Sequence, residues 1–267
     1  ADKVDSEIFS IPDSREGWVE SLIRIMCAYI DSPRYGKNKF PVFDYSLIRE
    51  KGLPIKGFGG QSSGSDPLKK MHQRIEGYLD AFCAGELVIP STEKTEEKRK
   101  PYSHTRLIAD IFNSIGACVV AGNVRRSAEI ALGDVNDKDF INLKNYEENP
   151  ERMEIGWMSN NSVTLKADDG FDDFSYIPDM AKRNVDNGEP GMINLYNMQK
   201  YGRYGKESPD EASLCNPCGE ICLENFELCN LSETFPHRCA DLLTFNQALK
   251  YATFYSTSVS LLPTHRP

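Results

Sequence analysis

The sequence predicts an α/β protein with a mostly parallel sheet, because short apolar segments alternate with longer amphipathic ones along the chain. The longer segments place apolar residues at helical spacing and carry helix-starting or helix-ending residues at their ends. The short segments have the length and composition of strands. There is no internal repeat, no low-complexity tract and no run of about eighteen apolar residues, so a membrane span is not expected.

In the first half, residues 13–16 are typical of a helix N-terminus, and Trp18, Leu22 and Ile25 follow at helical spacing. Further helices are expected over 67–82 and 107–118, and strands at 42–45 and 128–132. Two stretches between them are expected to lack helix and core strand: the glycine-rich 52–64 and the charged 86–106, which we interpret as a surface insertion.

In the second half, an amphipathic helix is expected over 171–187, ended by Gly188, and a final helix is expected to begin at the cap residue Thr244. Short strands are expected within 155–165 (ending after Val163), at 192–195 and at 220–223. The helices and strands therefore continue to alternate to the end of the chain.

The composition narrows the class of protein. The chain has 267 residues, 40% of them hydrophobic, and a formal net charge of -9, which disfavours general binding to nucleic acid but leaves room for a nucleotide ligand. Residues 1–5 show no apolar segment typical of a secretory signal. A chain of this size does not need a disulfide framework, so its eight cysteines indicate a reducing, cytoplasmic compartment. Cys27, Cys83 and Cys118 have apolar neighbours and are interpreted as buried structural thiols.

The other five cysteines cluster between 215 and 239, around a segment suited to chemistry on a polyol. Asn216, Cys218 and Glu220 alternate, so an extended chain would place an amide, a thiol and a carboxylate on one face. Pro217 and Gly219 indicate a constrained loop. The amide can orient hydroxyl groups, the carboxylate can move a proton, and the thiol can act as a nucleophile or a hydrogen-atom carrier.

A zinc site is the alternative interpretation of the same residues. Cys215 and Cys218 have the spacing of a ligand pair, and Cys222, Cys229, His237 and Cys239 offer further ligands. The uneven spacing of the later cysteines is unlike a zinc ribbon, which has two closely spaced pairs. Spacing alone leaves both interpretations open.

Residues 215–221 (Cys-Asn-Pro-Cys-Gly-Glu-Ile), followed by Glu-Leu-Cys-Asn-Leu at 227–231, closely resemble the active-site segment of adenosylcobalamin-dependent, class II ribonucleotide reductases. The resemblance is strongest to the monomeric branch that acts on ribonucleoside triphosphates. It implies part of a ten-stranded α/β barrel with Cys218 on a central finger loop. It implies that Cys218 becomes a thiyl radical, that Glu220 handles the proton of the 3′-hydroxyl group, that Asn216 hydrogen-bonds the ribose hydroxyls, and that Cys229 is half of a redox pair. It implies adenosylcobalamin as cofactor, a thioredoxin-type reductant and no metal ligand.

Upstream segments resemble the allosteric parts of the same family. Asp13 and Ser14 resemble the residues that hold the ribose of a dNTP or ATP effector, although this pair taken alone favours a plain helix cap. Arg49, Lys56 and the glycine-rich stretch 52–64 resemble the first specificity loop, where cations and backbone N–H groups meet phosphates. The second specificity loop is matched at Gly122, Asn123, Arg125, Arg126 and Ser127. Paired arginines are otherwise most often a solvated charge pair.

These resemblances divide the chain into an effector half, 1–135, and an active-site half, 136–267, of one partial barrel. A partner for Cys229 is not found, so the 267 residues alone are expected to be inactive. Three rivals remain: a reductase of the diphosphate or metal-radical branch, a zinc-stabilised binding module, and an inactive nucleotide-binding regulator. Intact Asn216, Cys218 and Glu220 argue against the regulator, which needs none of them.

Overall fold

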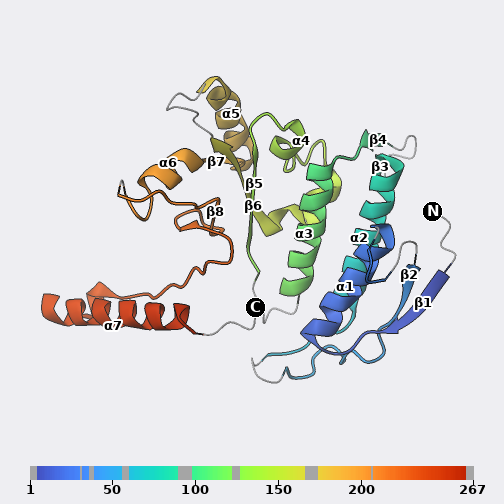
Figure 1. The fold of residues 1–267 in the computed structure, drawn as a ribbon, viewed down its shortest axis with the longest axis horizontal. Helices are drawn as coiled ribbons and strands as arrows, with labels where there is room; N and C mark the ends of the chain where they lie inside the picture. The colour runs from blue at the N-terminus through green and yellow to red at the C-terminus, as the bar shows by residue number, and fades with distance from the viewer. Residues whose placement is uncertain are drawn as a thin grey trace. The chain divides into compact units, whose positions relative to one another are not determined.

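Two structural units make up the chain, Ala1–Asn194 and Leu195–Pro267 (Figure 1). The computed structural model describes residues 5–30, 32–35, 39–55, 60–89, 98–121, 127–165, 174–205 and 207–262. Each unit is considered by itself below.

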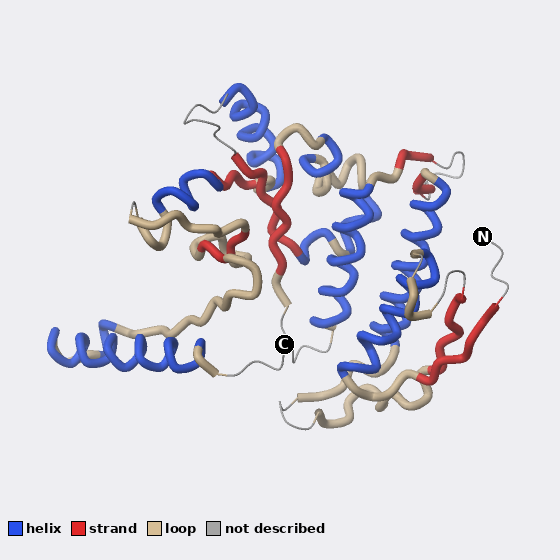
Figure 2. Tube along the Cα trace, viewed as in Figure 1, coloured by secondary structure: helices blue, strands red, loops and turns tan. Residues whose placement is uncertain are grey.

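The first unit alternates helices and short strands, as the sequence predicts (Figure 2). Its elements are β1 (Asp5–Ser10), α1 (Arg15–Tyr29), β2 (Lys39–Asp44), α2 (Asp66–Ala84), β3 (Glu86–Ile89), β4 (Lys98–Pro101), α3 (His104–Val120), β5 (Glu129–Asp134), α4 (Lys138–Ile141), β6 (Ser159–Leu165), α5 (Ile177–Asn187) and β7 (Gly191–Asn194). Two 3-10 segments, Pro150–Glu154 and Gly156–Met158, precede β6.

The larger sheet of this unit is parallel. Strand β6 lies between β5 and β7, with Glu129 opposite Ser159 and Ser162 opposite Gly191. Strands β1 and β2 form a second parallel pair. The α/β prediction is therefore confirmed. The ten-stranded barrel is not seen in the described residues, whose strands form small separate sheets.

Helix boundaries follow local signals. Ser14 caps α1, its hydroxyl accepting the Gly17 N–H at 3.0 Å. Gly188 ends α5 at a φ of 74°, a left-handed conformation that favours glycine.

The surface-insertion interpretation of 86–106 is wrong for much of that stretch. Strands β3 and β4 pair as an antiparallel hairpin, and the residues that follow β4 turn inward. Tyr102 is part of the hydrophobic core, and Arg106 is buried because carboxylate and amide groups surround its guanidinium. Residues 90–97 lie outside the described part of the chain.

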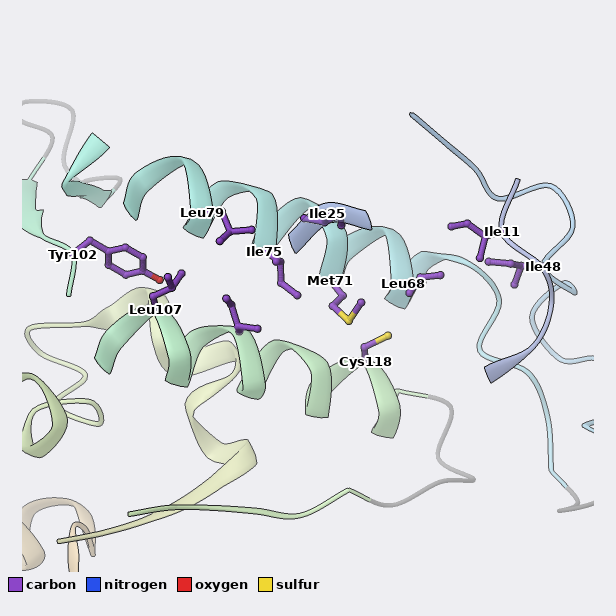
Figure 3. Packing of buried hydrophobic residues seen from close by; sticks show 11 residues of the cluster. Ile11, Ile25, Ile48, Leu68, Met71, Ile75, Leu79, Tyr102, Leu107 and Cys118 are labelled. Carbon is purple, nitrogen blue, oxygen red and sulfur yellow. The ribbon is translucent and has the colours of Figure 1, made fainter. Parts of the chain in front are cut away.

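The main core lies between helices, and α1 and α3 both pack against α2. Leu68, Met71 and Ile75 of α2 face Leu107 and Cys118 of α3 (Figure 3). Burying each such aliphatic side chain stabilises the fold by roughly 1.5–3 kcal/mol. Helix α3 lies between α2 and the β5–β7 sheet (Figure 1), so it connects the core to the strands. Cys118 is buried as predicted, whereas Cys27 is half-buried and Cys83 is exposed.

The second unit contains α6 (Leu195–Tyr201), the two-residue strands β8 (Leu214–Cys215) and β9 (Cys222–Leu223), and α7 (Leu242–Ser260). The prediction that Thr244 caps the last helix is wrong. Asp241 is the N-cap residue, and its carboxylate accepts the Thr244 N–H at 2.8 Å, because a cap bonds the N–H three residues ahead. Among the described helices of both units, none has the length and apolar character to cross a membrane.

Candidate active site

The segment carrying Asn216, Cys218 and Glu220 is a tight turn between β8 and β9. The Asn216 N–H donates to the Ile221 carbonyl at 3.1 Å, and the Gly219 N–H donates to the Asn216 carbonyl at 2.9 Å. Gly219 has a φ of 87°, which a residue with a side chain rarely adopts. The predicted constrained loop is confirmed, but the extended geometry is wrong because the chain reverses direction within these residues.

Asn216 organises the turn from inside. It is only 3% exposed, and its Oδ1 accepts the Ile221 N–H at 3.0 Å. Its Nδ2 donates toward the Cys229 Sγ at 3.6 Å, so the structure brings these two predicted site residues together. The turn thus uses one lone pair of the amide oxygen, and one N–H of the amide faces Cys229.

Cys218 and Glu220 lie on the exposed side of the same turn. Beneath them, Cys215 is buried and pairs across the strands with Cys222. Burial raises the pKa of the Cys215 thiol, and the nearby Cys222 and Glu220 raise it further. Cys215 is therefore held as a neutral thiol, whereas Cys218 is accessible to a reactant.

All eight cysteines are free, and each lies in the described part of the chain. Across the described residues, no three His, Cys, Asp or Glu side chains gather as a metal ion would need. The zinc-module interpretation therefore lacks a ligand set there.

Sequence reasoning missed Arg203, which contacts Asp210, Glu224 and Glu227 beside this turn. The partners lie 7, 21 and 24 residues away in sequence, so no helical or strand spacing signals the cluster.

In the first unit, the structure brings Asp13 and Arg49 together. The Arg49 Nε donates to the Asp13 Oδ2 at 2.5 Å, and its Nη1 donates to the Pro54 carbonyl at 3.2 Å. Both side chains are about a third exposed. Ser14 acts as the helix cap described above, which is the plain alternative for that residue.

In the glycine-rich stretch after Arg49, the described ends 52–55 and 60–64 pair with each other. Gly52 and Ser62 pair through an N–H···O bond of 2.9 Å, and the Ser62 N–H donates to the Leu53 carbonyl at 2.7 Å. The Ser62 hydroxyl also reaches the Arg49 carbonyl at 3.4 Å. The expectation of no regular structure is therefore corrected for the ends of the stretch. Lys56 lies outside the described residues.

The second predicted loop can be judged only at its flanks, because Gly122, Asn123, Arg125 and Arg126 lie outside the described residues. Ser127 is half-buried just before β5. At the start of β5, Glu129 accepts a 2.9 Å hydrogen bond from Asn113 of α3, and burial raises the pKa of its carboxyl group. The structure thus fastens the helix and the strand that flank the loop.

Comparison with known proteins extends over nearly the whole chain. Residues 1–79 match the family model for the insertion domain of B12-dependent ribonucleotide reductase. A probable adenosylcobalamin-dependent ribonucleoside-triphosphate reductase of Dictyostelium discoideum is 44% identical over 97% of the chain and 31% of the relative. The reductase of the same name from Euglena gracilis is 45% identical over 96% of the chain and 32% of the relative.

A crystal structure of a B12-dependent, class II ribonucleotide reductase superposes with a TM-score of 0.72 at 34% identity. The superposition covers 96% of this chain and 32% of that one, so the chain spans about a third of the length of these relatives. Sequence and fold agree on one family: over nearly its whole length the chain is similar to adenosylcobalamin-dependent, class II ribonucleotide reductases.

Proposed function

We propose that this protein reduces ribonucleoside triphosphates to 2′-deoxyribonucleotides, with Cys218 as the residue that carries the radical. The observation that supports this most directly is the turn between β8 and β9. It presents the Cys218 thiol and the Glu220 carboxylate on its exposed side and places the Asn216 amide against Cys229. The names of the relatives from Dictyostelium and Euglena support the choice of triphosphate substrate.

Each residue of the turn has one part in the proposed reaction. The Cys218 thiyl radical takes the 3′ hydrogen atom of the ribose, becomes a thiol and leaves the radical on the sugar. The Glu220 carboxylate accepts the proton of the 3′-hydroxyl group. The Asn216 amide binds a ribose hydroxyl. A dithiol that includes Cys229 supplies two electrons and two protons and becomes a disulfide while the 2′-hydroxyl group leaves as water. Glu220 then returns its proton to the 3′ oxygen, and the Cys218 thiol returns the hydrogen atom to the 3′ carbon, which regenerates the thiyl radical.

Adenosylcobalamin, when bound, supplies the radical that starts this chemistry. Cys218 is suited to take up this radical, because it is an exposed free thiol on a hydrogen-bonded turn. We assign the holding of the corrin ring to none of the described residues.

The first unit has the proposed regulatory role. Asp13 and Arg49 offer a carboxylate and a guanidinium side by side, which suits the hydroxyl and phosphate groups of a dNTP or ATP effector. Arg125 and Arg126 of the second loop are proposed to read the effector and the substrate base. A thioredoxin-type protein is the proposed reductant. Eight free cysteines are consistent with a cytoplasmic setting, and the family branch suggests a monomer.

The test uses the full-length protein and the Cys218→Ser variant, with Cys83→Ser as the control because Cys83 is also an exposed thiol. With ribonucleoside triphosphate, adenosylcobalamin and a dithiol, we expect Cys218→Ser to form no deoxynucleotide and to keep its affinity for a dNTP effector. The control should retain turnover. Deoxynucleotide formation by Cys218→Ser would overturn the assignment. Residues 1–267 alone are expected to give no product in this assay, because the chain offers no assigned partner for Cys229.

A further inference from the structure

Arg203 lies at the centre of a cluster of three carboxylates in the second unit. Its Nε and Nη2 donate to the two oxygens of Asp210 at 2.9 and 2.8 Å, and its Nη1 donates to the Glu227 Oε2 at 2.6 Å. Glu224 lies 3.5 Å from the same guanidinium. A bidentate arginine–carboxylate pair with further acceptors fixes geometry more strongly than a simple ion pair.

The Asp210 side of this cluster is firmly anchored. The Asp210 side chain is only 1% exposed, and its Oδ1 also accepts the Ala212 N–H at 2.9 Å. Its own N–H donates to the Gln199 carbonyl, and the Gln199 side chain donates to the Ala212 carbonyl at 3.0 Å. Hydrogen bonding to Arg203 lowers the pKa of Asp210 to about 2. Asp210 is therefore a fixed, ionised point tied to α6.

The Glu227 side of the cluster holds a strained turn over residues 224–227. Phe226 has a φ of 67°, although it is not a glycine, and its ring is 77% exposed, so no packing explains the conformation. A left-handed conformation is unfavourable for a residue with a side chain. The Glu227 carboxylate accepts the Glu224 N–H at 2.6 Å as well as the Arg203 bond. Both contacts lower the pKa of Glu227, and the hydrogen bond from the Glu224 N–H has the larger effect.

Cys229 follows this turn by two residues. Its recorded contact with the active-site turn is the weak 3.6 Å hydrogen bond from Asn216, which cannot by itself hold a segment that contains a strained residue. Strain of this kind persists only where the surrounding structure enforces it. Loss of Arg203 would also leave three like charges facing one another.

We propose that Arg203 is a positioning residue, which holds Cys229 beside Asn216 by fastening the strained turn 224–227 to Asp210. The functional part of this inference rests on the proposed role of Cys229 as a redox thiol. Arg203 acts through the turn and does not touch the substrate.

The test compares Arg203→Gln with Arg238→Gln in the full-length protein. Arg238 is the matched control, because it is an exposed arginine of the same unit that lies over the Phe235 ring and forms no ion pair with a described residue. We expect Arg203→Gln to speed hydrogen–deuterium exchange of residues 222–230 and to lower kcat by about 10- to 100-fold, as a displacement of about 1 Å can do. KM should stay unchanged, because the substrate still binds.

A second substitution distinguishes loss of the positioning role of Arg203 from a general loss of folding. Glycine adopts positive φ readily, so Phe226→Gly added to Arg203→Gln should slow the exchange again and restore part of kcat. Phe226→Ala removes the same ring but keeps the Cβ, and it should restore neither.

Normal exchange of residues 222–230 in Arg203→Gln would overturn the proposal, whatever happens to kcat. Equal rescue by Phe226→Ala and Phe226→Gly would also overturn it, because strain would then not be the cause. If the wild-type protein reduced no ribonucleotide, the proposed function would fail, while the exchange comparison would still decide whether Arg203 holds the turn.

Discussion

Replacing Asp110 with alanine is expected to lower the free energy of unfolding by about 3–5 kcal/mol, the range for breaking a buried ion pair. Asp110 is fully buried in α3 and bridges two arginines. Its Oδ2 accepts from the Arg106 Nε at 2.8 Å, and its Oδ1 accepts from the Arg152 Nε at 2.6 Å. The Tyr102 hydroxyl adds a third bond at 2.9 Å.

The magnitude depends on what the two arginines keep. Arg152 is 0% exposed and would retain the Leu143 carbonyl at 2.5 Å and the Asn113 amide oxygen at 2.8 Å, but no counter-charge. Arg106 would keep an ion pair with Glu151. One guanidinium is therefore left buried without compensation, and this loss dominates over the single Tyr102 hydrogen bond, worth about 1 kcal/mol.

Urea unfolding followed by circular dichroism measures the difference. Asp179→Ala is the matched control, because Asp179 also pairs with an arginine four residues away, Arg183, but is 55% exposed. Pairs of that kind contribute about 0.3–0.5 kcal/mol. Equal losses for Asp110→Ala and Asp179→Ala would refute the reasoning, since burial would then not set the cost.

Two further predictions concern pH and effector binding. Burial lowers the pKa of His72 to about 4, so the unfolded chain takes up a proton there between pH 6.5 and 4 that the folded chain refuses. The contribution of His72 to the free energy of unfolding is complete above pH 6.5 and should fall by roughly 1.4 kcal/mol per pH unit below it. In urea unfolding, His72→Gln should flatten this dependence of stability on pH, whereas His104→Gln, at an exposed histidine, should not. Parallel dependences for the wild type and both variants would contradict the assignment. Asp13→Asn should weaken dNTP binding measured by calorimetry, because Arg49 loses its ionic partner. Asp66→Asn, on the exposed start of α2, should leave the affinity unchanged. Equal affinities for the two variants would remove Asp13 from the proposed effector site.

The sequence was a reliable guide wherever one local signal decides the structure. Ser14 and Gly188 lie at helix ends because a hydroxyl acceptor and a left-handed residue act on their immediate neighbours. The same holds for the turn residues Pro217 and Gly219, which indicate a constrained loop without fixing its path.

Prediction failed where distant residues decide the outcome. Arg106 reads as a surface charge. Besides the local partner Asp110 it pairs with Asn149, which lies 43 residues further along the chain, and no local pattern reveals that second pairing. The alternation at Asn216, Cys218 and Glu220 suggested that an extended chain places them on one face, because the bonds to Ile221 that reverse the chain are not visible in spacing. The assignment of Lys56 and residues 122–126 to the specificity loops remains a prediction.

The bridging carboxylate of Asp110 also implies an order of events as the chain folds. Arg106 lies one helical turn from Asp110 and can pair with it as soon as α3 forms. Arg152 is 42 residues from Asp110 in sequence, so its pairing requires a long loop to close. We expect the first partner to hold the carboxylate in place before the second packs against it. We therefore expect helix α3 to form first and the segment that carries Arg152 to pack against it.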